Sequence, residues 1–206
     1  MDWISKLERK FGRYAITNLT LLFIGSNALG YLLMYTTPAL LAYLTLEPGL
    51  ILRGQVWRLI TWIVIPSGGN VLAVIIMLFF YYSIGTSMER TWGTFRYNLY
   101  LFSGILFTVI GAFILYFIFG GGYGYGWYFS SYYLCLSIFL AFAASYPDME
   151  VLLYFVIPLK VKWLAWLDVA YLAYDMIRGG FATRVVIIAS LLNFVLFYFS
   201  TKNLKP

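Results

Sequence analysis

The hydrophobic residues of this chain gather into six long apolar stretches, which are separated by glycines, prolines and small groups of charged residues. A helix needs about 20 predominantly apolar residues to cross the hydrocarbon core of a bilayer. The pattern therefore predicts an all-α polytopic membrane protein with a six-transmembrane-helix bundle. The predicted spans cover about residues 16–36, 70–87, 97–119, 128–146, 163–178 and 184–200.

The segment between the first two spans, residues 37–69, is moderately apolar but does not form one uninterrupted run. Proline removes a backbone donor and glycine loosens the backbone, so neither suits the interior of a helix. We expect a long first loop with short helical pieces at the membrane surface. The interruptions are Pro38, Pro48, Gly49, Gly54 and Pro66.

The N-terminal segment, residues 1–15, places Trp3, Leu7 and Phe11 four residues apart with charged residues around the other faces. This pattern is typical of an amphipathic helix in the cytoplasmic interface; a frayed polar tail is the alternative. Residues 16–200 would form the membrane domain, and residues 201–206 a short cytoplasmic tail.

Composition supports the membrane assignment and excludes several chemistries. The 206 residues are 63% hydrophobic and only 11% charged, whereas about 25% of the residues of a soluble domain are charged. The chain has one cysteine and no histidine, so we expect neither a metal site nor a cofactor. Its net charge of +6 comes from scattered single residues and pairs, which indicates membrane orientation rather than nucleic-acid binding.

The distribution of lysine and arginine predicts that both termini are cytoplasmic, because positive residues are enriched on that side. An even number of spans agrees with this orientation. The predicted cytoplasmic group is Lys6, Arg9, Lys10, Arg13, Arg90, Arg96, Lys160, Lys162, Lys202 and Lys205, and the smaller external group is Arg53, Arg58, Arg178 and Arg184.

The glycine-rich stretch FGGGYGYGWYFSS, residues 119–131, would lie in the external loop before the fourth span. It matches neither phosphate-binding glycine pattern and has no following lysine. Ser130 and Ser131 would need a base to act as nucleophiles, but histidine is absent and the lysines lie at the cytoplasmic side. We therefore interpret the stretch as an aromatic loop at the headgroup layer.

Small residues at four-residue spacing mark helix-packing surfaces in two spans, because they let helix backbones approach closely. They are Gly104, Thr108, Gly111 and Ala112 in the third span, and Ser137, Ala141 and Ser145 in the fourth.

The fifth span carries Asp168 and Asp175 on one face, with Tyr171 between them. An acidic residue near the middle of a bilayer costs about 2.5–3.5 kcal/mol on insertion scales, so Asp168 needs an explanation. One is a hydrogen bond to a neighbouring helix, with Asn193 or a tyrosine as donor; the other is a role in client binding or a proton pathway. Asp175 lies within a turn of Arg178, and an interfacial ion pair would explain it.

Three stretches together resemble the rhomboid superfamily. GQVWRLITWIVIP, residues 54–66, is similar to the W-R-x-x-T segment of its first loop, and GTSMERTWG, residues 85–93, to its G-x-x-x-E-x-x-x-G. Residues 146–168 resemble the fourth-to-fifth connection of bacterial rhomboid-like proteins. The motif positions are Trp57, Arg58, Thr61, Gly85, Glu89 and Gly93.

Two of these motifs also have a direct physical interpretation. The Arg58 guanidinium could tie several loop carbonyls together, with snorkelling to headgroups as the alternative. Glu89 could accept hydrogen bonds where Gly85 and Gly93 let chains come close.

The chain departs from active rhomboids at every catalytic position. Those proteases use a Gly-x-Ser-Gly serine and a histidine of the sixth span, with a histidine and an asparagine of the second span at the oxyanion. Family spacing implies Ala73 and Met77 at the latter two positions, and neither side chain can donate a hydrogen bond to an oxyanion. The nucleophile's position falls near Tyr132, and the adjacent Ser130 and Ser131 are not followed by glycine.

The resemblance therefore implies an inactive protein of the derlin-like pseudoprotease type, which binds transmembrane segments of client proteins without cleaving them. The alternatives are an unusual serine protease that uses Ser130 or Ser131, and a small transporter centred on Asp168. The expected client surface lies between the second and fifth spans. Its candidate residues are Phe79, Tyr82, Trp163, Trp166, Asp168 and Tyr171.

The expected partners are membrane lipids and transmembrane segments, with no nucleic acid; the pattern does not predict an oligomeric state. The expected location is a bacterial cytoplasmic membrane, or the endoplasmic reticulum membrane if the protein is eukaryotic.

Overall fold

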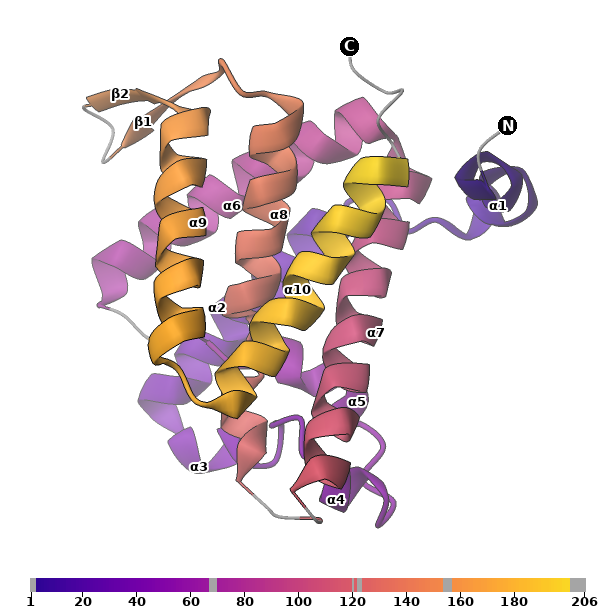
Figure 1. Ribbon diagram of the computed structural model, residues 1–206, viewed down its shortest axis with the longest axis vertical. Helices are drawn as coiled ribbons and strands as arrows, with labels where there is room; N and C mark the ends of the chain where they lie inside the picture. Colours follow the sequence, from indigo (N-terminus) through magenta and orange to yellow (C-terminus); the bar gives the residue numbers. More distant parts are fainter. Residues whose placement is uncertain (1–2, 67–69, 120, 122–123, 154–156, 201–206) are drawn as a thin grey trace.

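The computed structural model describes residues 3–66, 70–119, 121, 124–153 and 157–200. Six long helices form a bundle (Figure 1) and confirm the predicted helical segments in order. They are α2 (Leu19–Thr36), α6 (Val71–Trp92), α7 (Thr94–Ile118), α8 (Ser131–Ser145), α9 (Val161–Arg178) and α10 (Phe181–Ser200).

Five helical segments are long and apolar enough to cross a membrane, so the chain is an all-α polytopic membrane protein. Four are α2, α6, α7 and α10, and the fifth, Gly126–Ser145, joins the 3-10 helix η3 (Tyr125–Tyr128) to α8. The exception among the six long helices is α9, which carries Lys162, Asp168, Asp175 and Arg178 among its 18 residues. The sixth span therefore stays a prediction.

The two ends of the bundle differ in what they hold. Figure 1 places α1 (Trp3–Phe11), the C-terminal end of α10 and a small hairpin at one end. The short helices α3 (Pro38–Leu41), α4 (Pro48–Ile51) and α5 (Arg58–Thr61) lie at the other end, followed in the chain by the 3-10 helix η2 (Trp62–Val64). The prediction of short helical pieces in the first loop is thus confirmed. Proline begins both α3 and α4, where its missing N–H is not needed.

The hairpin, β1 (Glu150–Leu153) and β2 (Ile157–Lys160), was not predicted from the sequence. Its strands are antiparallel, with Glu150 opposite Lys160 and Leu153 opposite Ile157. It connects α8 to α9, where the sequence indicated only a connection.

The helix α8 forms the centre of the bundle, since every residue from Leu134 to Ala143 is buried. The small-residue stripe of α7 packs as predicted: a Cβ on Gly104 would lie 2.6 Å from Leu134 of α8. The Tyr100 hydroxyl donates to the Ser137 carbonyl oxygen at 2.8 Å. Asn193 of α10 also joins α7, since its amide donates to the Tyr100 carbonyl oxygen at 3.1 Å.

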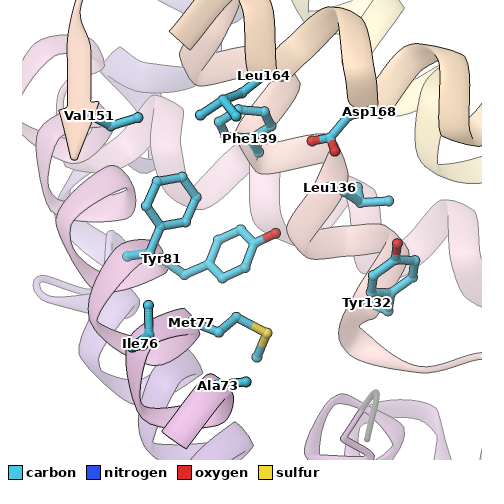
Figure 2. Close-up of a pocket in the computed structure, with 11 residues that line it drawn as sticks. Ala73, Ile76, Met77, Tyr81, Tyr132, Leu136, Phe139, Val151, Leu164 and Asp168 are labelled. Atoms are coloured by element: carbon cyan, nitrogen blue, oxygen red, sulfur yellow. The ribbon is translucent and has the colours of Figure 1, made fainter. Parts of the chain in front are cut away.

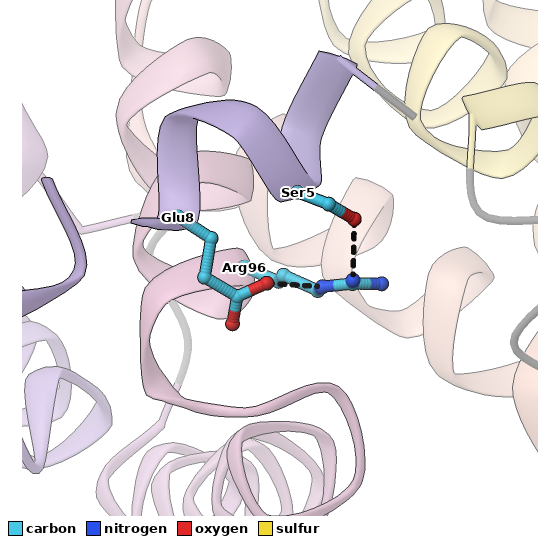
Figure 3. Close-up of polar contacts among 3 residues, drawn as sticks. All are labelled: Ser5, Glu8 and Arg96. Atoms are coloured by element: carbon cyan, nitrogen blue, oxygen red, sulfur yellow. Dashed lines mark hydrogen bonds and ion pairs between the residues drawn. The ribbon is translucent and has the colours of Figure 1, made fainter. Parts of the chain in front are cut away.

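The N-terminal segment forms the helix α1 rather than a frayed tail, although its placement at the membrane surface stays a prediction. Ile4 is buried, and the Arg96 guanidinium of α7 donates to Glu8 Oε2 at 3.2 Å and to Ser5 Oγ at 3.3 Å (Figure 3). The side chain of Trp3 and residues 201–206 lie outside the described part of the chain.

Candidate functional site

A groove of about 370 Å³ lies between α6, α8 and α9 (Figure 2). Buried Leu136 and Phe139 of α8 form its floor, and exposed Ala73 together with half-buried residues of α6 and α9 forms its walls. The lining is Ala73, Ile76, Met77, Phe80, Tyr81, Tyr132, Leu136, Phe139, Val151, Leu164 and Asp168.

Local contacts fix the ends of the three helices around the groove. Asn70 Oδ1 accepts from the Ala73 amide at 2.8 Å and caps α6, and Ser130 Oγ accepts from the Tyr132 amide at 3.4 Å and caps α8. The Lys162 ammonium donates to Asp148 Oδ1 at 3.0 Å, which ties the beginning of α9 to the segment that follows α8. The two caps therefore fix where α6 and α8 begin, and the ion pair links α9 to the segment that follows α8.

Three polar side chains reach into this otherwise apolar groove. The Asp168 carboxyl group and the Tyr81 hydroxyl point into the same space from opposite walls, and the Tyr132 hydroxyl lies nearby (Figure 2). In the described part of the chain, Asp168 has no hydrogen bond and no ion pair. The predicted hydrogen bond from Asn193 or a tyrosine is wrong for the described residues, because no tyrosine hydroxyl donates to Asp168 and the Asn193 amide nitrogen donates to the Tyr100 carbonyl oxygen at 3.1 Å instead.

Asp175 lacks the predicted ion pair with Arg178. The described residues contain two ion pairs, Arg96–Glu8 and Lys162–Asp148. The Arg178 guanidinium lies 6.0 Å from the Tyr174 ring centroid.

Five residues stand at or near the catalytic positions that the rhomboid resemblance implies, and they fall into two groups. Ala73, Met77 and Tyr132 line the groove. Ser131 does not, because its buried hydroxyl donates to Asn27 Oδ1 at 2.6 Å and lies 3.1 Å from the Ile65 carbonyl oxygen. Ser130 contributes instead to a neighbouring depression with Tyr132 and Tyr171.

Most of the predicted client-facing residues lie outside the groove. Of the six, only Asp168 lines it; Phe79, Trp163 and Trp166 are 65%, 61% and 69% exposed on outward faces. Tyr82 and Tyr171 are also exposed.

Helical spacing could have identified the true lining residues from the sequence. Ala73, Met77 and Tyr81 follow one another at intervals of four, as do Leu164 and Asp168, so each set shares one helix face. The predicted residues Phe79, Trp163 and Trp166 lie on other faces of the same helices, and their client-facing role stays a prediction.

The first-loop motif is a hydrogen-bonded clamp on residues 42–45. Arg58 is 2% exposed, and its guanidinium donates to the carbonyl oxygens of Ala42 at 3.0 Å and Thr45 at 2.9 Å. The Trp57 indole donates to the Tyr43 carbonyl oxygen at 3.2 Å, and the Thr61 hydroxyl to that of Leu44 at 3.1 Å. The carbonyl-binding interpretation of Arg58 is thus confirmed, and snorkelling is wrong.

Glu47 continues this clamp to the glycine-rich loop. Its Oε2 accepts from the amides of Gly124 and Gly126, each at 3.2 Å. A Cβ on Gly126 would lie 3.0 Å from Glu47 Oε2 and from the Leu46 carbonyl oxygen, so glycine permits this close approach. Burial lowers the pKa of Arg58, and nearby Glu47 partly offsets that effect. Gly120 and Gly122 lie outside the described residues.

The second motif joins the ends of α2, α6 and α7. Glu89 Oε1 accepts from the Asn18 amide at 3.1 Å, next to the beginning of α2. A Cβ on Gly85 would lie 2.6 Å from Thr20 Cγ2, and Gly93 has a φ of 84° between α6 and α7. The helix α6 continues to Trp92, beyond the predicted boundary at residue 87.

The described residues contain no group of three histidine, cysteine, aspartate or glutamate side chains that could hold a metal ion. The groove therefore offers a carboxylate, two hydroxyls and an apolar surface. These groups can bind a donor or a cation surrounded by apolar side chains.

Comparison with known protein families gives one match, over residues 16–202, to the family described as Eukaryotic integral membrane protein (DUF1751). The chain belongs to this family. The match covers all six long helices of this family member, including α9. No curated protein and no solved structure matches the chain.

Family membership establishes an integral multi-pass membrane protein. Because the family is described as eukaryotic, the expected bacterial cytoplasmic membrane receives no support.

Proposed function

We propose that this protein is a catalytically inactive rhomboid-like membrane protein that binds transmembrane segments of client proteins in the groove between α6, α8 and α9 without cleaving them. The observation that carries the proposal is the groove itself. It lies between the predicted second and fifth spans, where substrates enter active rhomboids, and Ala73, Met77 and Tyr132 line it.

The lining of the groove suits the side chains of a passing helix, because the central helix α8 forms its floor and side chains of α6 and α9 form its walls. A client helix would lie along the edges of α6 and α9 and insert side chains between them. Exposed Phe79 and Trp163 would then contact lipid or the flanks of the client.

The absence of cleavage is supported by the contacts of the serines. The Ser131 hydroxyl already donates to Asn27, and the Ser130 hydroxyl caps α8. The sequence has no histidine to activate either one. Cleavage of a reporter transmembrane segment in proteoliposomes, abolished when both serines are changed to alanine, would instead favour the protease alternative.

The proposal includes six spans, two cytoplasmic termini and residence in the endoplasmic reticulum membrane. The 18 residues of α9 extend about 27 Å, close to the thickness of the hydrocarbon core. Its exposed face includes Trp166, Leu167 and Ile177, which suit lipid. The position of α1 and the end of α10 at one end of the bundle also supports an even number of spans (Figure 1).

Photocrosslinking in intact membranes tests this function. A photoreactive residue at Met77 or Leu164 lies in the groove, and one at Leu106, which is exposed on α7, serves as the matched control. We expect crosslinked peptides that map to transmembrane segments of other proteins from the groove positions, and mainly lipid adducts from Leu106. Lipid adducts alone at all three positions would contradict the proposal.

A transporter centred on Asp168 is the second candidate, because this carboxyl group shares the groove with two hydroxyls. It predicts proton-coupled solute uptake into proteoliposomes that Asp168→Asn abolishes. Client capture by the wild type without any uptake would reject it.

A further inference from the structure

We infer that Asp168 makes the groove selective for client segments that carry lysine or arginine near the middle of their apolar stretch. The inference rests on the proposed function, since it names the clients of the same groove. It begins from a carboxylate that the described residues leave without a partner.

The depth of Asp168 sets where the client's charge must lie. It is the eighth residue of α9, about 10 Å from the first residue of the helix and about 15 Å from the last. Water and headgroups are therefore remote from both directions if α9 spans the bilayer. A partner for this carboxylate must come from within the membrane.

The chain's own cations on α9 do not supply that partner. Lys162 donates to Asp148 outside the groove, and Arg178 stands ten residues beyond Asp168 at the other end of the helix, near Tyr174. Among the residues that the structure describes, no lysine or arginine lines the groove. The site therefore has a negative group and two hydroxyls with no internal positive group.

The geometry of these polar groups suits a cation better than a neutral donor. A lysine ammonium has three donors and an arginine guanidinium has five, enough for the Asp168 carboxylate and the hydroxyls of Tyr81 and Tyr132. A basic residue within a client span is itself costly in lipid, so pairing relieves an unfavourable charge on both partners. A glutamine would gain only hydrogen bonds, and a glutamate would be repelled.

The apolar part of the groove explains why the cation should be flanked by apolar residues. Met77, Leu136 and Leu164 surround the polar groups and would pack against neighbouring side chains of the client. The recognised feature is thus one basic residue inside an otherwise apolar segment. A polybasic surface peptide lacks the apolar flanks.

The test uses the full chain with a photoreactive residue at Leu164, reconstituted in phosphatidylcholine vesicles. The probes are four synthetic leucine-alanine spans that differ only in a central lysine, glutamine, leucine or glutamate. We expect about five- to thirtyfold more capture of the lysine probe than of the leucine probe, the range of intramembrane polar contacts in model peptides. We expect the least capture for glutamate.

Variants then assign the preference to one side chain. Asp168→Asn should remove the lysine preference and keep capture of the leucine probe, while the matched control Asp175→Asn on the same helix should retain the preference. Asp168→Lys should reverse the order, with glutamate captured above lysine.

The outcomes separate this inference from the proposed function. Equal capture of all four probes by the wild type would overturn the inference and leave client binding intact. Capture of none of them, together with lipid adducts only in intact membranes, would overturn the proposed function itself. The comparison of the four probes needs no change at Asp168, so it stands even if Asp168→Asn fails to fold.

Discussion

Two regions of the molecule treat buried and half-buried polar groups in opposite ways. At the loop end, Arg58, Thr61 and Ser131 are each hydrogen-bonded to backbone or side-chain partners from distant parts of the chain. In the groove, Asp168 has no such partner among the described residues. Because buried polar groups normally stay hydrogen-bonded, the first region serves as a scaffold and the second is the better candidate for meeting another molecule.

The largest effect should come from Arg58→Ala, which removes the centre of the loop clamp. It leaves the Ala42 and Thr45 carbonyl oxygens without these donors and buried Glu47 without its nearby cation. We expect a loss of about 3 kcal/mol or more of unfolding free energy. Thermal unfolding in detergent measures it.

Arg58→Lys is the matched control for this change. It keeps the charge but not the planar fork, so its stability should lie between those of the wild type and Arg58→Ala. If the alanine variant were as stable as the wild type, the loop clamp would not be a scaffold.

A smaller loss is expected for Ser131→Ala. The change leaves the buried Asn27 amide oxygen without its hydroxyl donor, which should cost about 1–3 kcal/mol. Ser130→Ala removes only the cap of α8 and should cost about 0.5–2 kcal/mol. The same unfolding assay measures both losses. If Ser131→Ala were as stable as the wild type but no longer cleaved a reporter segment that the wild type cleaves, Ser131 would be a catalytic residue and not part of the scaffold.

In the groove, Asp168→Asn should leave the stability unchanged or raise it by about 1 kcal/mol, because it removes a costly charge without breaking a contact in the described chain. Thermal unfolding in detergent should therefore give Asp168→Asn a higher melting temperature than Arg58→Ala. A loss as large as that of Arg58→Ala would show that Asp168 is part of the scaffold.

The smallest effect concerns acid sensitivity at the exposed Asp148–Lys162 pair. The hydrogen bond and the charge of Lys162 lower the pKa of Asp148 in the folded protein. The pair therefore stabilises the fold fully at a pH above the ordinary aspartate pKa of about 3.9. This stabilisation is lost as the pH falls through the lower pKa that Asp148 has in the folded state. Asp148→Asn should flatten the dependence of stability on pH between about 5 and 3. If the dependence of stability on pH were unchanged in Asp148→Asn, the Asp148–Lys162 pair would not stabilise the packing of α9.

The candidate site was only partly predictable. The rhomboid resemblance implies Ala73 and Met77 through its family spacing, hydropathy indicates Asp168, and all three line the groove. Tyr81 and Leu164 were not predicted, although they lie four residues from Met77 and Asp168, respectively, on the same helix faces. Ser131 was considered as a nucleophile, but its partners Asn27 and Ile65 are far away in the sequence and only the fold brings them together.

The sequence by itself determined the order and type of the long helices and the broken first loop, because apolar run length and proline act locally. Only the tertiary structure decided the pairing of β1 with β2, the docking of α1 on Arg96, and which side chains line the groove. These features depend on which helix faces meet, and a helix whose faces are nearly all apolar carries little signal about its neighbours. Such faces contact lipid and protein with almost equal free energy. Close packing and the pairing of a few polar groups therefore decide which helix faces contact each other.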